Sequence, residues 1–135
     1  MAYFACRGCR QPLTPHLVEV RLPPLVPGEN EAGRIRPPRV PRGAWALNLH
    51  PDEGLYEPRG VVIHPGDITG TRRHPDPDRL GVACCRGPSG TDGPNLICSV
   101  CEADVAAEQG DCWTQNQVVL DLPRVIHSFT EDPDL

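Results

Sequence analysis

Seven cysteines are spread over this chain, and four of them form two Cys-x-x-Cys pairs. Cys6 and Cys9 lie in "CRGC" near the start, and Cys98 and Cys101 lie in "CSVC" in the final third. A turn of this spacing points both sulfurs to one side, and two such turns supply the four thiolates that zinc prefers at tetrahedral corners. The spacing therefore predicts one structural zinc ion held by these four residues.

This pairing would join the two ends of the chain. Residues 10–97, which number 88, separate the pairs, and closing so long a loop lowers the entropy of the unfolded chain. The stabilisation expected on that ground is about 3 to 5 kcal/mol. Zinc binding is therefore expected to be coupled to folding, as it is in other small metal-dependent domains.

Other uses of the cysteines stay open. Cys84 and Cys85 could complete a local site with Cys98 and Cys101, which would leave the first pair with Cys112 or a histidine. Neighbouring residues of a strand point to opposite faces, so adjacent cysteines rarely reach one metal, and this favours the long-range pairing. A dithiol redox centre, buried free thiols and disulfides are the remaining alternatives.

Two other sets of residues could carry catalysis. Cys112 in "GDCW" is a candidate thiol for a thiol-dependent reductase, although the adjacent Asp111 disfavours its thiolate and a small buried side chain is the plainer interpretation. Histidine followed by proline and aspartate occurs at His50, His64 and His74, where a second metal would make a metal-dependent hydrolase. The same residue types are also typical of turns, which are far more common than catalytic pairs.

Three aromatic residues could line a binding pocket. Trp45, Tyr56 and Trp113 could together accept a flat or cationic ligand through their ring faces. In a chain with only two residues of each aromatic type, they could equally be the core itself.

Short runs of alternating apolar and polar residues predict strands as the elements that position these groups. Two such runs are "HLVEVRL" and "AWALNLH", each with one face expected to be buried. The residues predicted to face the core are Val18, Val20, Leu22, Trp45, Leu47 and Leu49.

Further strands are expected along the rest of the chain, and helices are scarce. The best helical candidate, residues 102–109, fits a strand equally well. The other predicted strands cover residues 3–5, 60–64, 95–98, 116–122 and 124–129. The sequence thus predicts a mostly β fold, a small zinc-stabilised antiparallel β domain with many loops and little helix.

Length and composition limit the size of the core. The chain has 135 residues, enough for a single domain spanning 1–135, but 17 prolines and 13 glycines interrupt it too often for long elements. A metal crosslink would help a chain with so thin a core. Residues 23–43 form a Pro/Arg-rich loop, the expected protein-contact surface, and residues 130–135 form an acidic tail.

Charge and hydropathy exclude some partners. A net charge of −5 makes a nucleic-acid partner unexpected, because such proteins need clustered cations to release counterions from phosphates. No apolar run approaches the roughly 18 residues of a membrane span, and the start of the chain does not resemble a secretory signal. We therefore expect no membrane association and a cytoplasmic location, where thiols stay reduced.

The two cysteine turns resemble those of the β-tent zinc modules, a group that includes the Yippee proteins, the ligand-binding domain of cereblon and the R-type methionine sulfoxide reductases. The resemblance is carried by "FACRGCRQPLT" and "GPNLICSVCEADV". It implies two antiparallel sheets meeting at an angle, with zinc on Cys6, Cys9, Cys98 and Cys101 at the apex. The chain has no Gly-Trp just after the second pair, and no Arg-aromatic-Cys-x-Asn segment, so the resemblance implies a fold and not an activity.

The function expected from the sequence is a non-catalytic, cytosolic zinc-binding module that binds a small ligand or a protein partner. The alternatives are a thiol-dependent reductase, a metal-dependent hydrolase and a zinc-ribbon nucleic-acid binder.

Overall fold

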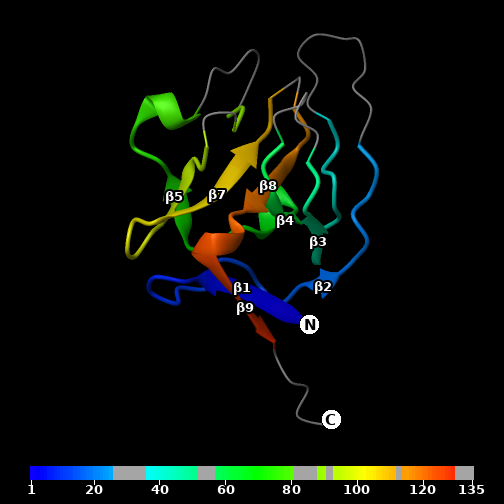
Figure 1. Cartoon of the computed structure of the whole chain (residues 1–135), viewed down its shortest axis with the longest axis horizontal. Coiled ribbons are helices and arrows are strands. Elements are labelled where there is room, and N and C mark those ends of the chain that lie inside the picture. Colours follow the sequence, from blue (N-terminus) through cyan, green and yellow to red (C-terminus); the bar gives the residue numbers. More distant parts are fainter. Residues whose placement is uncertain (26–35, 52–56, 81–87, 91–92, 112–113, 130–135) are drawn as a thin grey trace.

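In the residues that it describes, a computed structural model of the chain shows two β-sheets and three short 3-10 helices (Figure 1). It describes residues 1–25, 36–51, 57–80, 88–90, 93–111 and 114–129. The strands are β1 (Ala2–Cys6), β2 (Val18–Glu19), β3 (Ala44–Asn48), β4 (Gly60–Ile63), β5 (Thr71–Arg73), β6 (Leu96–Cys98), β7 (Asp104–Gln109), β8 (Gln117–Leu120) and β9 (Val125–Phe129). The prediction of a mostly β fold with little helix is confirmed.

The larger sheet has seven strands in the order β2-β3-β4-β8-β7-β6-β5. Every neighbouring pair in it is antiparallel except β2 and β3, which are parallel. The open question about residues 102–109 is settled, because β7 is a strand that pairs with both β6 and β8.

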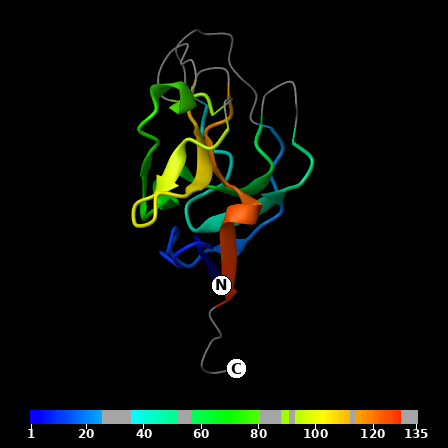
Figure 2. The same cartoon turned by 60° about the vertical axis from the view of Figure 1, so that its left-hand side comes forward.

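The smaller sheet joins the beginning and the end of the described chain. β1 pairs antiparallel with β9, with Ala2 opposite Phe129 and Cys6 opposite Val125. This pair lies below the larger sheet in Figures 1 and 2. Residues 11–17 cover the other edge of β1, where Leu17 and Ala2 exchange two backbone hydrogen bonds. The position of β1 is thereby fixed from both sides.

Apolar side chains are buried on both faces of the larger sheet. Val61 and Ile63 of β4 belong to the main cluster, which also contains Phe4 of β1 and therefore lies between the two sheets. Val62, between them in sequence, points the other way and joins a second cluster with Val40. A sheet covered on both faces no longer shows a simple alternation of apolar and polar residues.

The predicted burial of β3 is correct for Trp45 and wrong for two leucines. Leu47 and Leu49 are each 38% exposed, whereas Asn48 on the opposite face is 3% exposed. The reason is that this opposite face is also covered: Ala46 packs in the second cluster, and the Asn48 amide donates a hydrogen bond to Glu57.

The strand predicted in "HLVEVRL" is shorter than expected. Only Val18 and Glu19 form β2, and Val18 is 52% exposed because β2 is an edge strand. Val20 and Leu22 are partly buried against the second cluster, so the inward direction predicted for these two residues is correct.

The helices η2 (Pro65–Asp67), η3 (Pro77–Leu80) and η4 (Leu122–Arg124) are single turns. None of the helices in the described ranges has the length and apolar character needed to cross a membrane.

Part of the Pro/Arg-rich loop is bound to the larger sheet. Pro38 forms a bridge with Asn116, and the Arg39 N–H donates to the Asn116 carbonyl at 3.0 Å. Residues 26–35 of that loop and the acidic tail 130–135 lie outside the described residues. That the whole chain forms one domain stays a prediction.

Candidate metal centre

The first cysteine pair forms a tight turn at the end of β1. Cys6 is the last residue of the strand, and its N–H donates to the Gln11 carbonyl at 2.9 Å. The Arg10 N–H donates back to the Cys6 carbonyl at 2.7 Å, and Arg10 has a left-handed backbone with φ of 64°. The chain is thereby folded around the Cys6 and Cys9 sulfurs.

The second pair repeats this turn at the end of β6. The Cys98 N–H donates to the Ala103 carbonyl at 2.8 Å, and the Glu102 N–H donates to the Cys98 carbonyl at 2.9 Å. Glu102 has φ of 65°, at the position that corresponds to Arg10. A left-handed conformation costs about 1 kcal/mol or more outside glycine, so its occurrence at both equivalent positions marks one turn geometry used twice.

The two turns bring four sulfur atoms together. The sulfurs of Cys6, Cys9, Cys98 and Cys101 all lie within 4.8 Å of one another. Across the turns, Cys6 lies 3.5 Å from Cys101 and Cys9 lies 3.4 Å from Cys98. A tetrahedral site with metal–sulfur bonds of about 2.3 Å has sulfur–sulfur edges of roughly 3.8 Å, so the cluster fits such a site after small adjustments.

All four cysteines are free thiols in this structure. Sulfur atoms in a disulfide lie about 2.05 Å apart, well below the distances observed here. Within the described ranges, this is the one group of three or more potential ligands that could hold a metal ion. Since thiolates are the ligands that zinc accepts in structural sites, the donor set suits zinc.

The surroundings of the sulfurs shift the pKa values of individual cysteines in opposite directions. Burial opposes ionisation of Cys98, but the backbone N–H groups of Cys101 and Val100 donate to its sulfur and lower its pKa to about 7. The Gln11 N–H favours the Cys9 thiolate, but burial and hydrogen bonds with the other thiols outweigh it and raise the pKa of Cys9 to about 12. A divalent cation would displace the protons that these thiols share.

Burial also raises the pKa of Cys6, whose sulfur faces that of Cys101. Four thiolates this close would repel one another, so without a cation some of them keep their protons. The cluster has the chemistry of a site that gains its full negative charge only when a metal enters.

Of the three residues predicted to line a pocket, Trp45 is the one that lies within the described residues. Its ring meets those of Phe4 and His127 edge to face, at 5.2 and 5.1 Å, while Phe4 and His127 stack at 4.7 Å. Trp45 and His127 line a hollow of about 330 Å³, which we call the Trp45 hollow, together with Glu19 and the apolar residues Met1, Ala2, Leu17 and Val18. Tyr56 and Trp113 lie outside the described residues.

His127 was missed as a pocket residue in the sequence. The predicted strand "RVIHSF" contains the relevant signal. Val125 and His127 are two residues apart and therefore lie on the same face of the strand, and Val125 belongs to the main cluster. Its importance depends on the pairing of β9 with β1, which places it opposite Phe4.

Two of the three His-Pro segments have turn roles. Nδ1 of His64 accepts a hydrogen bond from the Gly66 N–H at 2.8 Å, and Nδ1 of His74 accepts one from the Asp76 N–H at 3.0 Å. These contacts match the turn interpretation of such segments. Cys84, Cys85 and Cys112 lie outside the described residues, so the reductase alternative, which depends on Cys112, stays a prediction.

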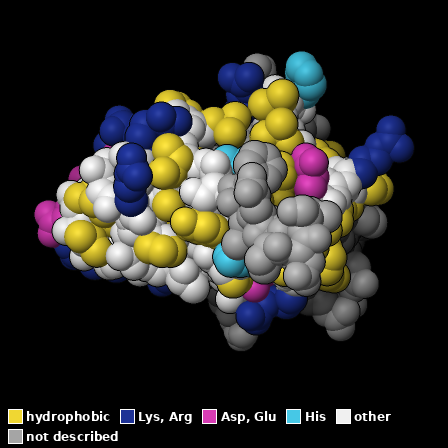
Figure 3. Space-filling model, turned by 90° about the horizontal axis from the view of Figure 1, so that it is seen from below, with side chains coloured by type: hydrophobic (Ala, Val, Ile, Leu, Met, Phe, Trp, Pro, Cys, Tyr) yellow, Lys and Arg dark blue, Asp and Glu magenta, His cyan; other side chains and the backbone are white. Residues whose placement is uncertain are grey.

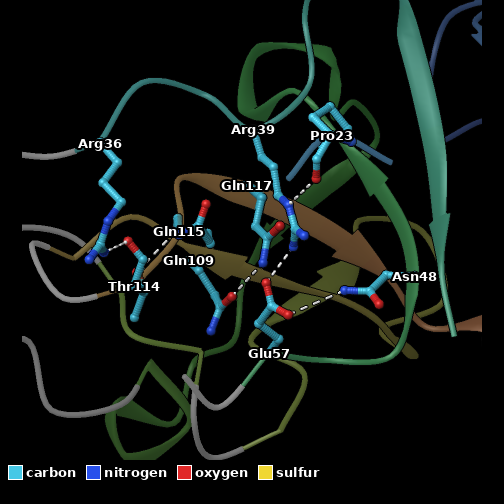
Figure 4. A network of polar contacts seen from close by, with 9 residues as sticks. All are labelled: Pro23, Arg36, Arg39, Asn48, Glu57, Gln109, Thr114, Gln115 and Gln117. Carbon is cyan, nitrogen blue, oxygen red and sulfur yellow. Dashed lines mark hydrogen bonds and ion pairs between the residues drawn. The ribbon is translucent and has the colours of Figure 1, made fainter. Parts of the chain in front are cut away.

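A buried polar network that the sequence does not predict lies on the second face of the larger sheet (Figure 4). Arg39 and Glu57 form an ion pair that is more than nine-tenths buried, and Nδ2 of Asn48 donates to the same carboxylate. Nε2 of Gln117 donates to Oε1 of Gln109 at 2.8 Å. Gln117 alternates with valine in "NQVVLDL", a pattern typical of a solvent-facing residue, yet it is fully buried. Its burial depends on tertiary contacts that the local pattern does not record.

No protein-family model matches this chain, and neither a curated protein nor a solved structure matches it. The fold and the site therefore define a mostly β protein with a four-cysteine cluster that could hold a metal ion.

Proposed function

We propose that this chain is a non-catalytic zinc-binding module in which the metal fastens its two sheets together. The observation that carries the proposal is the pair of equivalent turns that place four sulfurs within 4.8 Å. One turn extends from β1 of the smaller sheet and the other from β6 of the larger sheet. A metal at this point would crosslink elements that are far apart in sequence.

This arrangement supports kinship in architecture with the β-tent zinc modules. In this chain each of two sheets contributes one Cys-x-x-Cys turn to the sulfur cluster, as the resemblance implies, although β2 and β3 of the larger sheet are parallel. A reducing compartment such as the cytosol would keep the four thiols available for zinc.

Metal analysis of the purified full chain tests the proposal. We expect one zinc per chain, and tetrahedral thiolate absorption bands when cobalt replaces zinc. Cys98→Ser is expected to lose the metal, whereas Cys112→Ser, the matched substitution of a cysteine that belongs to neither Cys-x-x-Cys pair, is expected to keep it. A chain without stoichiometric zinc, or equal loss in both variants, would contradict the proposal.

The binding role is supported by the Trp45 hollow. Its volume of about 330 Å³ lies in the range of small-ligand sites, roughly 300–1,000 Å³. Glu19 pairs with Trp45 across β2 and β3, so the carboxylate and the indole share one face of the sheet. An anionic group beside an aromatic ring suits a flat or cationic small molecule.

Titration with N-methylpyridinium, followed by tryptophan fluorescence, tests this role. We expect saturable quenching that Glu19→Gln weakens and Glu102→Gln, a substitution of an exposed acid outside the hollow, leaves unchanged. Quenching that is linear in concentration, or equal in both variants, would show collision rather than binding.

A further inference from the structure

A second hollow lies beside the cysteine turns and is lined by two cations. Its volume is about 460 Å³, and its lining residues are Arg7, Gly8, Ala103, Pro123 and Arg124. We call it the arginine hollow. Figure 3 shows several basic side chains on the left of the molecule, the side that carries both cysteine turns in Figure 1, with other basic side chains at the top, bottom and right.

The first cation is held in place by backbone atoms. Nε of Arg7 donates to the Pro123 carbonyl at 3.1 Å, and Nη2 donates to the Val125 carbonyl at 3.2 Å. The Arg7 backbone N–H also donates to the Arg124 carbonyl at 2.9 Å. These contacts orient the guanidinium without neutralising it, because a carbonyl carries no net charge, and they leave other N–H groups of Arg7 unused.

The second cation, Arg124, ends η4 at the same hollow. Within the described ranges, no carboxylate lies within 4 Å of the guanidinium nitrogens of Arg7 or Arg124. Asp121 interacts with Arg124 electrostatically: burial raises the pKa of Asp121, and the positive charge of Arg124 offsets only part of this rise. Asp121 does not line the hollow, so the lining combines two positive charges with no acid.

Two small residues in or next to the cysteine turns line the hollow. Gly8 belongs to the first turn, and Ala103 follows the second. Gly8 does not have a backbone that demands glycine, and a Cβ there would stand at ordinary contact distances of 3.5 Å from the Cys101 sulfur and 3.7 Å from the Cys6 sulfur. A Cβ at this position would therefore lie beside the sulfur cluster without a clash, and the backbone there does not require glycine.

We infer that the arginine hollow is a binding site for a small phosphomonoester. A phosphomonoester carries nearly two negative charges at pH 7 and several acceptor oxygens, which matches two guanidinium groups reaching it from different elements. A carboxylate carries one charge and is satisfied by a single arginine. The hollow is larger than a phosphate group, and Pro123 and Ala103 offer apolar surface to the organic part.

Titration of the isotope-labelled, zinc-loaded chain with phenyl phosphate at constant ionic strength tests this site. We expect saturable NMR shifts of the Arg7 and Arg124 side-chain N–H groups and of the Gly8 amide. Arg124→Gln is the main variant, because its guanidinium makes no hydrogen bond within the described chain. The loss of one charge-assisted contact is expected to weaken binding about tenfold. Arg21→Gln, which removes an exposed arginine elsewhere, is expected to change nothing.

Titrations with other anions distinguish a phosphomonoester site from other kinds of anion site. Inorganic phosphate should shift the same signals more weakly, and benzoate, the carboxylate with the same ring, should bind worse than phenyl phosphate. Absence of saturable shifts, equal losses in both variants, or tighter binding of a single-stranded oligonucleotide would overturn the inference. Zinc content is measured on the same samples, so a failure here is distinguished from a failure of the zinc proposal.

Discussion

At the scale of single residues, the four cysteines differ in how readily they ionise. Among Cys6, Cys9 and Cys98, the pKa of Cys98 is lowered to about 7, whereas the pKa values of Cys6 and Cys9 are raised. Their type and spacing could be taken from the sequence. The inequality could not, because it arises from backbone N–H groups and burial around each sulfur.

This inequality predicts a steep pH dependence of zinc affinity. Protons and zinc compete for the same sulfurs, so the zinc affinity increases with pH. With Cys6 and Cys9 still protonated at pH 8, affinity is expected to increase throughout pH 6–8, by about a hundredfold per pH unit for two displaced protons. Competition with a chelator of known pH dependence measures this. An affinity that is level between pH 6 and 8 would show that the thiols are already ionised.

At the scale of elements, strand positions followed from the sequence more reliably than strand faces. The strands at residues 60–63, 96–98 and 125–129 lie where their apolar runs predict. The predicted inner face of β3 fails for Leu47 and Leu49, because alternation identifies one buried face and the larger sheet has two. Asn48 is buried on the second face, where its amide donates a hydrogen bond to Glu57, nine residues later.

The start of β4 allows a sharp test of the packing between β4 and β8. Gly60 has φ of 154°, and a Cβ there would lie 2.0 Å from the Leu120 carbonyl oxygen, a backbone atom that cannot rotate away. Gly60→Ala is expected to lower the free energy of unfolding by about 3 kcal/mol, measured by urea denaturation of the zinc-loaded protein.

The matched control for this substitution is Gly110→Ala, because a Cβ at Gly110 would meet nothing within 4 Å. It is expected to change the free energy of unfolding by no more than about 0.5 kcal/mol. Similar losses in both variants would mean that the close approach of β4 to β8 is not what requires glycine at position 60.

At the scale of the whole molecule, the chain closes on itself at two adjoining places. β1 pairs with β9, and the turn that ends β1 meets the turn that ends β6 at the sulfur cluster. The arginine hollow lies where these two closures meet, since Arg7 and Gly8 come from the first turn and Arg124 precedes β9. A metal that fixes the turns would also fix one wall of that hollow.

The sequence alone determined the strand-rich fold and the identity of the four cysteines, because hydrophobic period and Cys-x-x-Cys spacing are local properties of the chain. The tertiary structure alone decided what surrounds them: His127 beside Trp45, the buried pair Arg39 and Glu57, and two arginines at one hollow. Those arrangements join residues separated by as many as 117 positions, from Arg7 to Arg124. Only the pairing of strands brings such residues together, and no short pattern in the sequence records it.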